Sequence, residues 1–391
     1  MLSETLSLIC GIIKIFHTKL ESTLLGAFFI TRYMDKNHFD VIVVGFGLSG
    51  LAVTKRLEEQ NKKVLGISGQ FPTASQVAGG ICNPVVLKKF NLAWNSEELY
   101  KNAVPFYKGF QQQFQENFYI EKPILKIFNS IKEQNDWFSA LGKPILDNFL
   151  VEDLMVNKNI SLNVPHKIGS TKHTGLLYVG NLLNSYKEYL IKMDRFLEQD
   201  FAFTDLNVGS EGVRYKNYSA DNIIFCEGSS VNQNPYFNFL PIQGNKGEYI
   251  TIKAPNLKLD DIVKGSFFMI PKGNDTYKVG ATYSRDFEGV DPTNSAKNQL
   301  IEKVNQMINC DFEVIDQEAG IRPTVTDRKP IIGPHPKYAN VYISNGFGSR
   351  GILFGPTVSK QLVEAIYSHK EIPKEINVSR FYKDFDEAPF L

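Results

Sequence analysis

The sequence has no excess of charge of either sign and no long apolar run. Its 391 residues hold 43 Lys and Arg against 42 Asp and Glu, a formal net charge of +1. A nearly neutral chain offers no global attraction to nucleic acid or to acidic membranes, so nucleic acid is not expected as a partner. No stretch approaches the ~18 apolar residues that a membrane-spanning helix needs, and we expect no transmembrane segment. Partners must therefore be recognised at local sites.

Cysteines and histidines lack the spacing of disulfide frameworks and metal sites. The cysteines are widely separated and form no C-x-x-C pair, which favours a reducing compartment, and we expect a cytoplasmic protein. None of the six histidines shows the i, i+4 spacing or the neighbouring cysteines typical of zinc ligands, so no metal is expected. The four cysteines are Cys10, Cys82, Cys226 and Cys310.

Residues 1–33 form a segment with a pattern of their own. Leu6, Ile9 and Ile13 recur at the spacing of one face of an amphipathic helix. The segment has neither a clear basic start nor a small-residue cleavage site, so a secretory signal is not expected. Met34 lies six residues before a glycine-rich strand. Our hypothesis is that residues 1–33 are an extension from a mis-called start codon, which mass spectrometry of the native N-terminus would test.

A glycine-rich turn follows the first apolar strand. Residues Asp40–Val44 (DVIVV) lead directly into GFGLSG and then into a helical pattern, and a second strand is predicted over Lys63–Ile67. In such a strand–turn–helix unit, the first glycine allows the tight turn, the second lets the backbone approach a pyrophosphate, and the third lets the helix pack on the strand. The helix N-terminus then attracts the phosphate charge. The sequence predicts a dinucleotide site at Gly45, Gly47, Leu48, Ser49 and Gly50; the alternative is a turn used only for packing.

One part of the usual dinucleotide pattern is missing. The acidic residue that ends the second strand and binds the ribose hydroxyls would fall at Ser68, whose hydroxyl offers one neutral hydrogen bond. This departure argues against NAD as an exchanging cofactor. It favours a cofactor held by many other contacts.

The middle of the chain contains a further glycine-containing loop, three predicted helices and another buried strand. The loop SQVAGGICNP (Ser75–Pro84) suits a close approach to a ligand. Helices are predicted over Glu97–Tyr119, Ile131–Leu141 and Asn181–Leu190, and Asn222–Gly228 (NIIFCEG) is a buried strand expected to join the first sheet.

Alternating strands then predict an antiparallel sheet. They cover Gly247–Lys253, Ser266–Lys272 and Thr276–Ser284, the last two joined by a Gly-Asn-Asp turn, and a helix is expected over Asn294–Ile308. No repeat or flexible linker separates two halves. We therefore expect an α/β protein, with a Rossmann-like cofactor domain interleaved with an α+β substrate domain that contains the antiparallel sheet.

Two motifs near the end of the chain add a second glycine loop. They are GIRPTVTDRKPIIG (Gly320–Gly333) and NGFGSRGILFGPTVSKQLVEAI (Asn345–Ile366). We expect the glycines at 346, 348 and 351 to form a loop before a helix that begins at about Gly355. A flavin ring could lie there, because backbone N–H groups and a helix N-terminus stabilise charge on the reduced ring. The alternative is a loop that only caps the helix.

Six motifs in this order resemble the FAD-dependent D-amino-acid oxidase superfamily, from about Phe39 to Ile366. They are DVIVVGFGLSG, SQVAGG, IIFCEG, VGATY, GIRPTVTDRKPIIG and GFGSRGILFGP. The superfamily includes glycine oxidase, sarcosine oxidase and the FAD domain of the tRNA wobble-uridine modification enzyme. The motifs are specific for the superfamily and not for a substrate; GSRG, with Arg350 after Ser349, resembles the tRNA-modifying branch.

The resemblance implies an extended FAD, with its ADP part at Gly45–Gly50 and its isoalloxazine beside Gly346–Ile352. It also implies that Arg322, in G-x-R-P, pairs with a substrate carboxylate; a structural pair with Asp327 is the alternative. With the turn at 45–50, the cofactor-binding residues expected are Ser68, Ser75, Ala78, Gly79, Gly80, Gly228, Gly346, Gly348, Ser349, Arg350, Gly351 and Ile352. The expected cofactor domain comprises 36–85, 155–230 and 320–391, and the substrate domain 86–154 and 231–319.

The activity implied is oxidation of the C–N bond of a small amino acid or amine. A hydride passes to flavin N5, the imine hydrolyses in water, and electrons go on to O2 or another acceptor. One alternative is an oxidase acting on a modified uridine side chain of tRNA. Another is a flavin-binding protein without catalysis.

Overall fold

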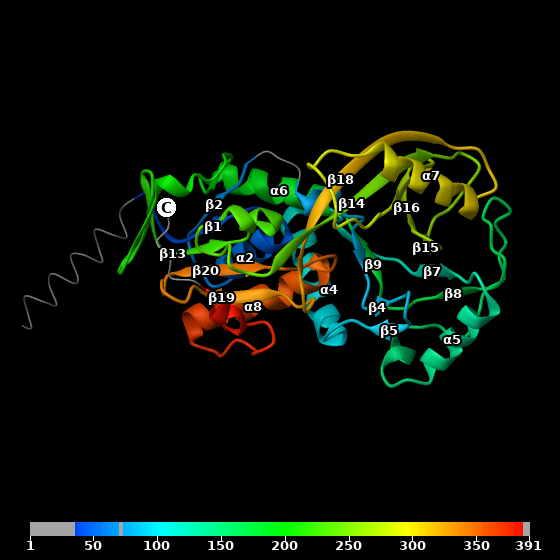
Figure 1. The fold of residues 1–391 in the computed structure, drawn as a ribbon, viewed down its shortest axis with the longest axis horizontal. Coiled ribbons are helices and arrows are strands. Elements are labelled where there is room, and N and C mark those ends of the chain that lie inside the picture. The colour runs from blue at the N-terminus through cyan, green and yellow to red at the C-terminus, as the bar shows by residue number, and fades with distance from the viewer. Residues whose placement is uncertain (1–35, 70–72, 386–391) are drawn as a thin grey trace, which may run out of the picture.

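The computed structural model describes residues 36–69 and 73–385. The expectations for residues 1–33, including Cys10, lie outside these ranges. Two sheets of different construction stand side by side along the long axis of the molecule (Figure 1). In the described part of the chain, no helix is long and apolar enough to cross a membrane.

The first sheet has eight strands and a parallel centre. Its path is β10-β2-β1-β13-β12-β11, and β20 pairs with β13 and with β19. The predicted strand after Asn222 belongs to it: β13 runs parallel to β1, with Val41 opposite Asn222. The strands are β1 (His38–Val44), β2 (Val64–Ile67), β10 (Phe196–Leu197), β11 (Leu206–Gly209), β12 (Gly212–Tyr215), β13 (Tyr218–Phe225), β19 (Ile331–Pro334) and β20 (Val341–Asn345).

Both faces of this sheet are buried, as its continuous apolar strands require. Val41 and Val43 of β1 face a layer of helices, whereas Ile42 and Val44 join a second core with Phe225 on the opposite face. The helix layer comprises α2 (Leu48–Glu58), α4 (Ser96–Phe114), α6 (Val179–Lys192) and α8 (Gly351–Ser368).

The second sheet has seven strands and is mainly antiparallel, in the order β18-β14-β17-β16-β15-β7-β8. The predicted turn between its central strands is present, with Asn274 and Asp275 in the left-handed region at φ 50° and 56°. Helix α7 (Asn294–Met307) packs on one face. The strands are β7 (Ile124–Ile127), β8 (Ile168–Ser170), β14 (Ile242–Lys253), β15 (Ile262–Lys264), β16 (Phe268–Gly273), β17 (Thr276–Gly280) and β18 (Glu313–Val325).

Shorter elements fill the space between the sheets. Strand β9 (Gly175–Leu177) pairs with β3 (Ile81–Cys82) and β6 (Tyr119–Glu121), and β4 (Val85–Val86) pairs with β5 (Asn91–Leu92). Helices α3 (Ala74–Val77) and α5 (Ile131–Leu141) complete the α-helices described here. The predicted helix over Glu97–Tyr119 is too long, because Gln115 turns left-handed at φ 56° and Tyr119 already pairs in β6.

Sheet membership suggests how the chain divides into domains. We propose a cofactor domain built on the parallel sheet and a substrate domain built on the antiparallel one. Strand β8 pairs with β7 in the antiparallel sheet, although the sequence assigned residues 155–230 to the cofactor domain. Strand β18 runs across the expected boundary at residue 320.

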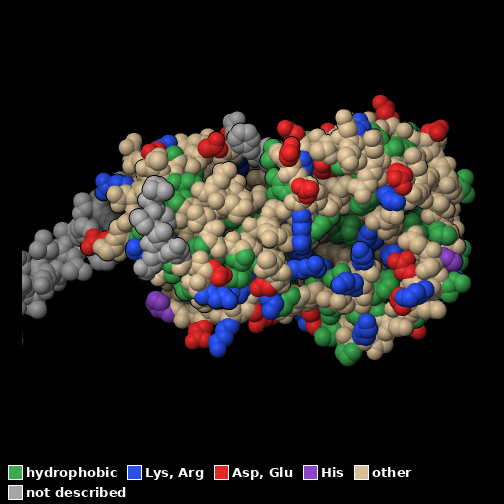
Figure 2. Space-filling view, in the orientation of Figure 1, with side chains coloured by type: hydrophobic (Ala, Val, Ile, Leu, Met, Phe, Trp, Pro, Cys, Tyr) green, Lys and Arg blue, Asp and Glu red, His purple; other side chains and the backbone are tan. Residues whose placement is uncertain are grey.

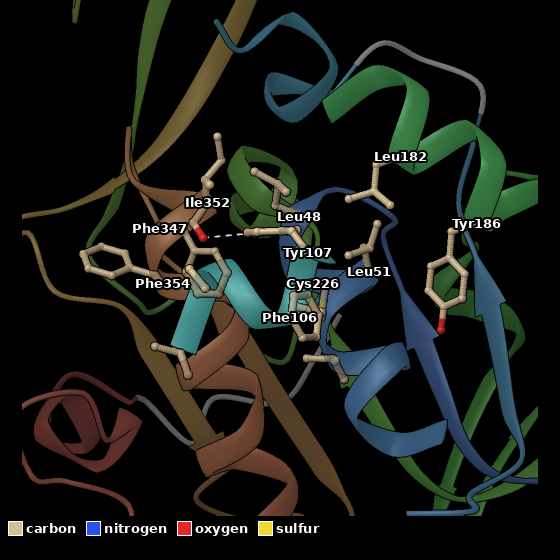
Figure 3. Close-up of a cluster of buried hydrophobic side chains, with 14 of the residues drawn as sticks. Leu48, Leu51, Phe106, Tyr107, Leu182, Tyr186, Cys226, Phe347, Ile352 and Phe354 are labelled. Carbon is tan, nitrogen blue, oxygen red and sulfur yellow. Dashed lines mark hydrogen bonds between the residues drawn. The ribbon is translucent and has the colours of Figure 1, made fainter. Parts of the chain in front are cut away.

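The helix layer joins segments from both halves of the sequence (Figure 3). Tyr107 of α4 is fully buried, and its hydroxyl donates to the Ile352 carbonyl oxygen of α8 at 3.0 Å. Pro356, four residues after Ile352, has no N–H to give that carbonyl. Tyr107 therefore supplies the hydrogen bond that the proline withholds, and α8 continues through Pro356.

Candidate active site

The turn between β1 and α2 is closed by backbone contacts that leave no room for side chains. Gly45 has φ +92°, and a Cβ there would lie 2.6 Å from the Cys226 carbonyl oxygen. A Cβ on Gly50 would lie 1.9 Å from the Gly45 carbonyl oxygen. The first and third glycines of the motif thus have the steric tasks predicted from sequence.

This turn leaves the N-terminus of α2 suited to an anion. Gly47 is the N-cap residue, it offers no side-chain cap, and the first turn contains no acidic residue. The Leu48 N–H donates to Ser75 Oγ at 3.0 Å, which brings the α3 segment against the turn. The Ser49 hydroxyl instead donates to Ser344 on β20, so only the Ser49 backbone can face a ligand. A helix start whose N-cap residue is a glycine and whose first turn has no acidic residue fits a phosphate group.

Ser68 lies one residue beyond β2, beside the same turn. Its N–H donates to the Leu197 carbonyl oxygen at 3.1 Å, and its hydroxyl approaches the Gly69 carbonyl oxygen at 3.5 Å. The Gly45 N–H donates to the Ile67 carbonyl oxygen at 2.8 Å. Ser68 therefore lies at the sheet edge where it was expected, and it carries no charge.

The segment after α3 links the two sheets. The Gly79 N–H donates to the Tyr249 hydroxyl of β14 at 3.3 Å. A Cβ on Gly80 would lie 2.2 Å from the Leu177 carbonyl oxygen, so this segment passes close to β9. A cavity of about 120 Å³ lies between it and the antiparallel sheet, lined in part by Ala78, Gly79, Lys278 and Glu318.

The second glycine loop follows β20 and is held by side chains. Asn345 is buried, its Oδ1 accepts from the Gly346 N–H at 2.7 Å, and its Nδ2 donates to the Gly228 carbonyl oxygen at 2.9 Å. The Gly348 N–H donates to the Pro323 carbonyl oxygen at 2.9 Å. These bonds hold the loop against the IIFCEG and GIRP motifs, which are far away in sequence.

Arg350 ends this loop and lies against the SQVAGGICNP segment. Its Nη1 donates to the Asn83 carbonyl oxygen at 3.3 Å, and burial lowers the pKa of its guanidinium. The neighbouring Ser349 is exposed. In the described residues, Arg350 has no acidic partner, so its charge is available to a bound group.

Helix α8 begins at Gly351, four residues before the predicted start at Gly355. Gly351 and Ile352 thus form the first turn of the helix and not the loop. The Ile352 side chain is buried among Leu48, Tyr107 and other core residues, so only the backbone of this turn can face a cofactor. As in α2, the first turn has no acidic residue and no side-chain cap.

Arg322 lies on the face of the antiparallel sheet that meets the cofactor half. Gly320, two residues before it in β18, packs on Ala74 and Val77 of α3, and residues two apart in a strand share a face. The Arg322 guanidinium covers Gly247, where a Cβ would lie 1.9 Å from Nη2. Any side chain at position 247 would therefore clash with the Arg322 guanidinium.

The hydrogen bonds of Arg322 use neutral acceptors. Its Nη1 donates to Asn245 Oδ1 at 3.2 Å and to the Thr282 carbonyl oxygen at 3.4 Å. Asp327, the structural partner considered from sequence, pairs with Arg380 instead, at 3.0 Å. No acidic partner of Arg322 is present in the part of the chain that the structure describes. Its positive charge is free for a ligand.

The same face of the sheet carries lysines as well. Lys264 of β15 stands beside Lys126 of β7 in the register, and Lys278 of β17 contacts Glu318 at 2.6 Å. Figure 2 shows a hollow in this half of the molecule with hydrophobic side chains inside it and several Lys and Arg side chains around it. Desolvation and the nearby Lys126 lower the pKa of Lys264 to about 8. The surroundings of the hollow favour anionic ligands.

Sequence reasoning missed three polar residues of this site. Asn245 is 1 % exposed, and its Nδ2 has no partner among the described residues. Tyr249 and Asn345 provide links between motifs. Their positions follow from strand register and loop closure, which the local sequence pattern does not contain, although Asn345 does open the NGFGSRG motif. No group of His, Cys, Asp and Glu in the described residues could hold a metal, and Cys82, Cys226 and Cys310 are unpaired.

Comparisons with known proteins agree with this architecture. Glycine oxidase from Geobacillus kaustophilus superposes with a TM-score of 0.73 at 17% identity, covering 88% of this chain and 99% of that one. L-proline dehydrogenase from P. horikoshii superposes with a TM-score of 0.69 at 15% identity, covering 88% and 98%. At such identities the superpositions show a shared fold.

Sequence relatives point to the same group. The tRNA 5-methylaminomethyl-2-thiouridine biosynthesis bifunctional protein MnmC of Idiomarina loihiensis is 22% identical over 90% of this chain and 60% of its own length. The bifunctional protein ThiO/ThiG of Trichormus variabilis is 21% identical over 90% of this chain and 56% of its own. The chain thus spans less than two thirds of these relatives. The model of the family described as FAD dependent oxidoreductase (DAO) matches residues 40–365, and this chain therefore belongs to the DAO family of FAD-dependent oxidoreductases.

Proposed function

We propose that the protein oxidises the C–N bond of a small amino acid or amine that carries a carboxylate. The observation that carries this proposal is Arg322, a guanidinium without an acidic partner in the described residues, on the sheet face that meets the cofactor half. A planar fork of donors suits a carboxylate, and a two-point pair fixes the orientation of the substrate.

The FAD would lie across the carboxyl edge of the parallel sheet. Gly47–Gly50 at the N-terminus of α2 would hold its pyrophosphate, and the Gly346–Arg350 loop, which Arg350 joins to Asn83, would hold its isoalloxazine. Bound FAD would supply the oxidising power, taking a hydride at N5 from the carbon next to nitrogen, after which water hydrolyses the imine. The Arg350 charge and the α8 N-terminus would stabilise negative charge at the far edge of the ring.

The residues of the chain would then orient the substrate, and the bound flavin would carry out the oxidation. Arg322 would hold the carboxylate, and the buried Asn245 Nδ2 is a spare donor beside it. With the substrate amine unprotonated, no side-chain base is needed. O2 or another acceptor would take the electrons afterwards.

An anaerobic screen tests this proposal. Glycine, sarcosine, proline or a D-amino acid should bleach the flavin absorbance of the holoenzyme. Replacing Arg322 with alanine should raise the apparent dissociation constant of a carboxylate substrate about 10- to 100-fold, since a hydrogen-bonded charge contributes roughly 1.5–3 kcal/mol. The amide of the same substrate should be affected much less.

The exposed Arg214 on β12 offers a matched control. Arg214→Ala should bind both compounds like the unchanged protein. An equal loss of affinity for the carboxylate and its amide in the Arg322 variant would show that Arg322 does not bind the carboxylate. A flavin that no amine or amino acid reduces would contradict the proposed oxidation as a whole.

A second candidate is oxidation of a modified uridine side chain in tRNA. The observations in its favour are the basic surroundings of the hollow and the similarity to proteins named for tRNA 5-methylaminomethyl-2-thiouridine biosynthesis. The net charge of +1 counts against a large phosphate footprint. Bleaching by tRNA that carries an aminomethyl uridine, and by no free amino acid, would favour this candidate.

A further inference from the structure

The carboxyl end of β2 lacks the acidic residue that usually binds the adenosine ribose in Rossmann-type sheets. Ser68 occupies that place, and its hydroxyl is turned to the Gly69 carbonyl oxygen. A neutral hydroxyl can bind one ribose oxygen, whereas a carboxylate accepts from both hydroxyls. In the described structure, a different segment of the chain brings a carboxylate to the end of β2.

The neighbouring strand β10 ends beside β2. The two strands run parallel, with Phe196 opposite Gly66 and Leu197 opposite Ile67, and the Ser68 N–H donates to the Leu197 carbonyl oxygen. Parallel strands leave a sheet at the same edge. The residues that follow β10 therefore run beside Ser68 and Gly69, about one strand spacing of ~4.8 Å away.

Asp200 is the acidic residue that this arrangement brings to the end of β2. A Cβ built on Gly69 would lie 1.9 Å from Asp200 Oδ1 and 3.0 Å from its Cγ, so the carboxylate covers the Gly69 backbone. Any side chain at Gly69 would displace it. In the described residues the Asp200 carboxylate has no hydrogen bond or ion pair, and the residue is exposed. Its charge is thus uncommitted.

The position also fits the rest of the cofactor. The Gly45 N–H bonds to the Ile67 carbonyl oxygen, so the end of β2 adjoins the turn that would hold the pyrophosphate. In the order β10-β2-β1, Asp200 approaches from the outer side of β2, away from the α2 N-terminus. A ribose that follows the pyrophosphate outward along this edge would meet the carboxylate.

We propose that Asp200 binds the hydroxyls of the adenosine ribose of FAD and so replaces the acidic residue missing at Ser68. This inference rests on the proposed placement of the ADP part of FAD at Gly45–Gly50. It moves ribose recognition from the end of β2 to a segment more than a hundred residues later in the chain. Charge-assisted hydrogen bonds of this kind are stronger than neutral ones.

The test measures cofactor affinity and not turnover. Apoprotein is titrated with FAD, and quenching of flavin fluorescence gives the dissociation constant. Asp200→Asn should weaken FAD binding about 10- to 100-fold. Adding Ser68→Glu to that variant should recover at least half of the loss on a logarithmic scale, because it restores an acid at the usual place. Asp194→Asn, an exposed change six residues earlier, should leave the constant unchanged.

Competition by nucleotides tests the ribose contact without relying on the fold of a variant. ADP should displace FAD from the unchanged protein at least tenfold better than 2′,3′-dideoxy-ADP, and this preference should vanish in the Asp200→Asn protein. An Asp200 variant within twofold of the unchanged protein, or an unaltered preference for ADP, would overturn the role of Asp200. If ADP does not compete with FAD in the unchanged protein, the placement itself is wrong, whatever Asp200 does.

Discussion

The two glycine loops of this protein occupy equivalent places and are built in different ways. Each follows a parallel strand, β1 or β20, and each opens a helix whose first turn lacks acidic residues. The first is closed by its own backbone, with Gly50 against the Gly45 carbonyl oxygen. The second is held by hydrogen bonds of Asn345 and Arg350 to distant segments. The backbone contacts that close the first loop can be predicted from its short motif, whereas the side-chain bonds that hold the second loop to distant segments cannot.

The largest effect is expected from removing the third glycine of the first loop. Gly50→Ala places a Cβ 1.9 Å from the Gly45 carbonyl oxygen, so the turn must open. We expect a loss of about 3 kcal/mol or more in the free energy of unfolding, together with loss of FAD. Urea denaturation and flavin content would measure both.

The same change in the second loop sharpens the comparison. Gly348 has only the Pro323 carbonyl oxygen at 4.0 Å from an added Cβ, so Gly348→Ala should cost about 1 kcal/mol, from its left-handed backbone alone. Gly109→Ala in α4, with open space around it, serves as the control and should be neutral or stabilising. Equal losses at Gly50 and Gly348 would contradict the distinction between the loops.

A smaller effect is expected from the charge of the second loop. Arg350→Ala should slow reduction of the flavin by substrate about 100-fold, because the variant loses a preorganised positive donor near the ring. Arg350→Lys keeps the charge and should retain most of the rate. Anaerobic stopped-flow traces would give the rates, and the flavin midpoint potential should fall in the alanine variant. A rate unchanged by either substitution would remove Arg350 from the proposed site.

A pH-dependent effect, smaller than that of Gly50→Ala, is expected from a carboxyl group behind the first loop. Burial raises the pKa of Glu227 to about 7, against the opposing hydrogen bond from Asn234. Between pH 4.5 and 7 the unfolded chain loses this proton and the folded chain keeps it, so the contribution of Glu227 to stability falls as the pH rises. At pH 8 the buried charge of Glu227 lowers the free energy of unfolding by about 2 kcal/mol, a value that allows for the partial exposure of the residue.

Glu227→Gln removes that cost and is sterically conservative. The variant should be more stable than the unchanged protein at pH 8 and about equal to it at pH 4. Urea denaturation of both proteins across this range gives the difference, from which other titrating groups cancel. A difference that does not change with pH would show that Glu227 titrates normally.

Much of the fold could be predicted because its signals are local. The β1–α2 unit, the turn at Asn274–Asp275 and the apolar β13 each carry their own pattern. The start of α8 was placed four residues late because Pro356 normally marks a helix start or break. Tyr107 compensates for that proline from another helix, and nothing near Pro356 in the sequence announces it.

The candidate site was less predictable for the same physical reason. The glycines of both loops were found, since their spacing is a local property. Asn245 and Tyr249 escaped notice because strand register, and not sequence spacing, brings them to Arg322 and Gly79. The domain limits around β8 depend on a pairing of three residues that carries no sequence pattern of its own.

Helices α2 and α8 pack together although the ribosome makes them at very different times. Arg56 of α2 donates to the Pro356 carbonyl oxygen, 300 residues later in the chain. At ~5–20 residues per second, a ribosome needs roughly 15 to 60 s to add these residues. During that interval the growing chain holds β1 and α2 without the helix that covers them. The growing chain therefore leaves an apolar surface incomplete for that time, and in the proposed placement FAD could be held by both glycine loops only after the second loop has been made.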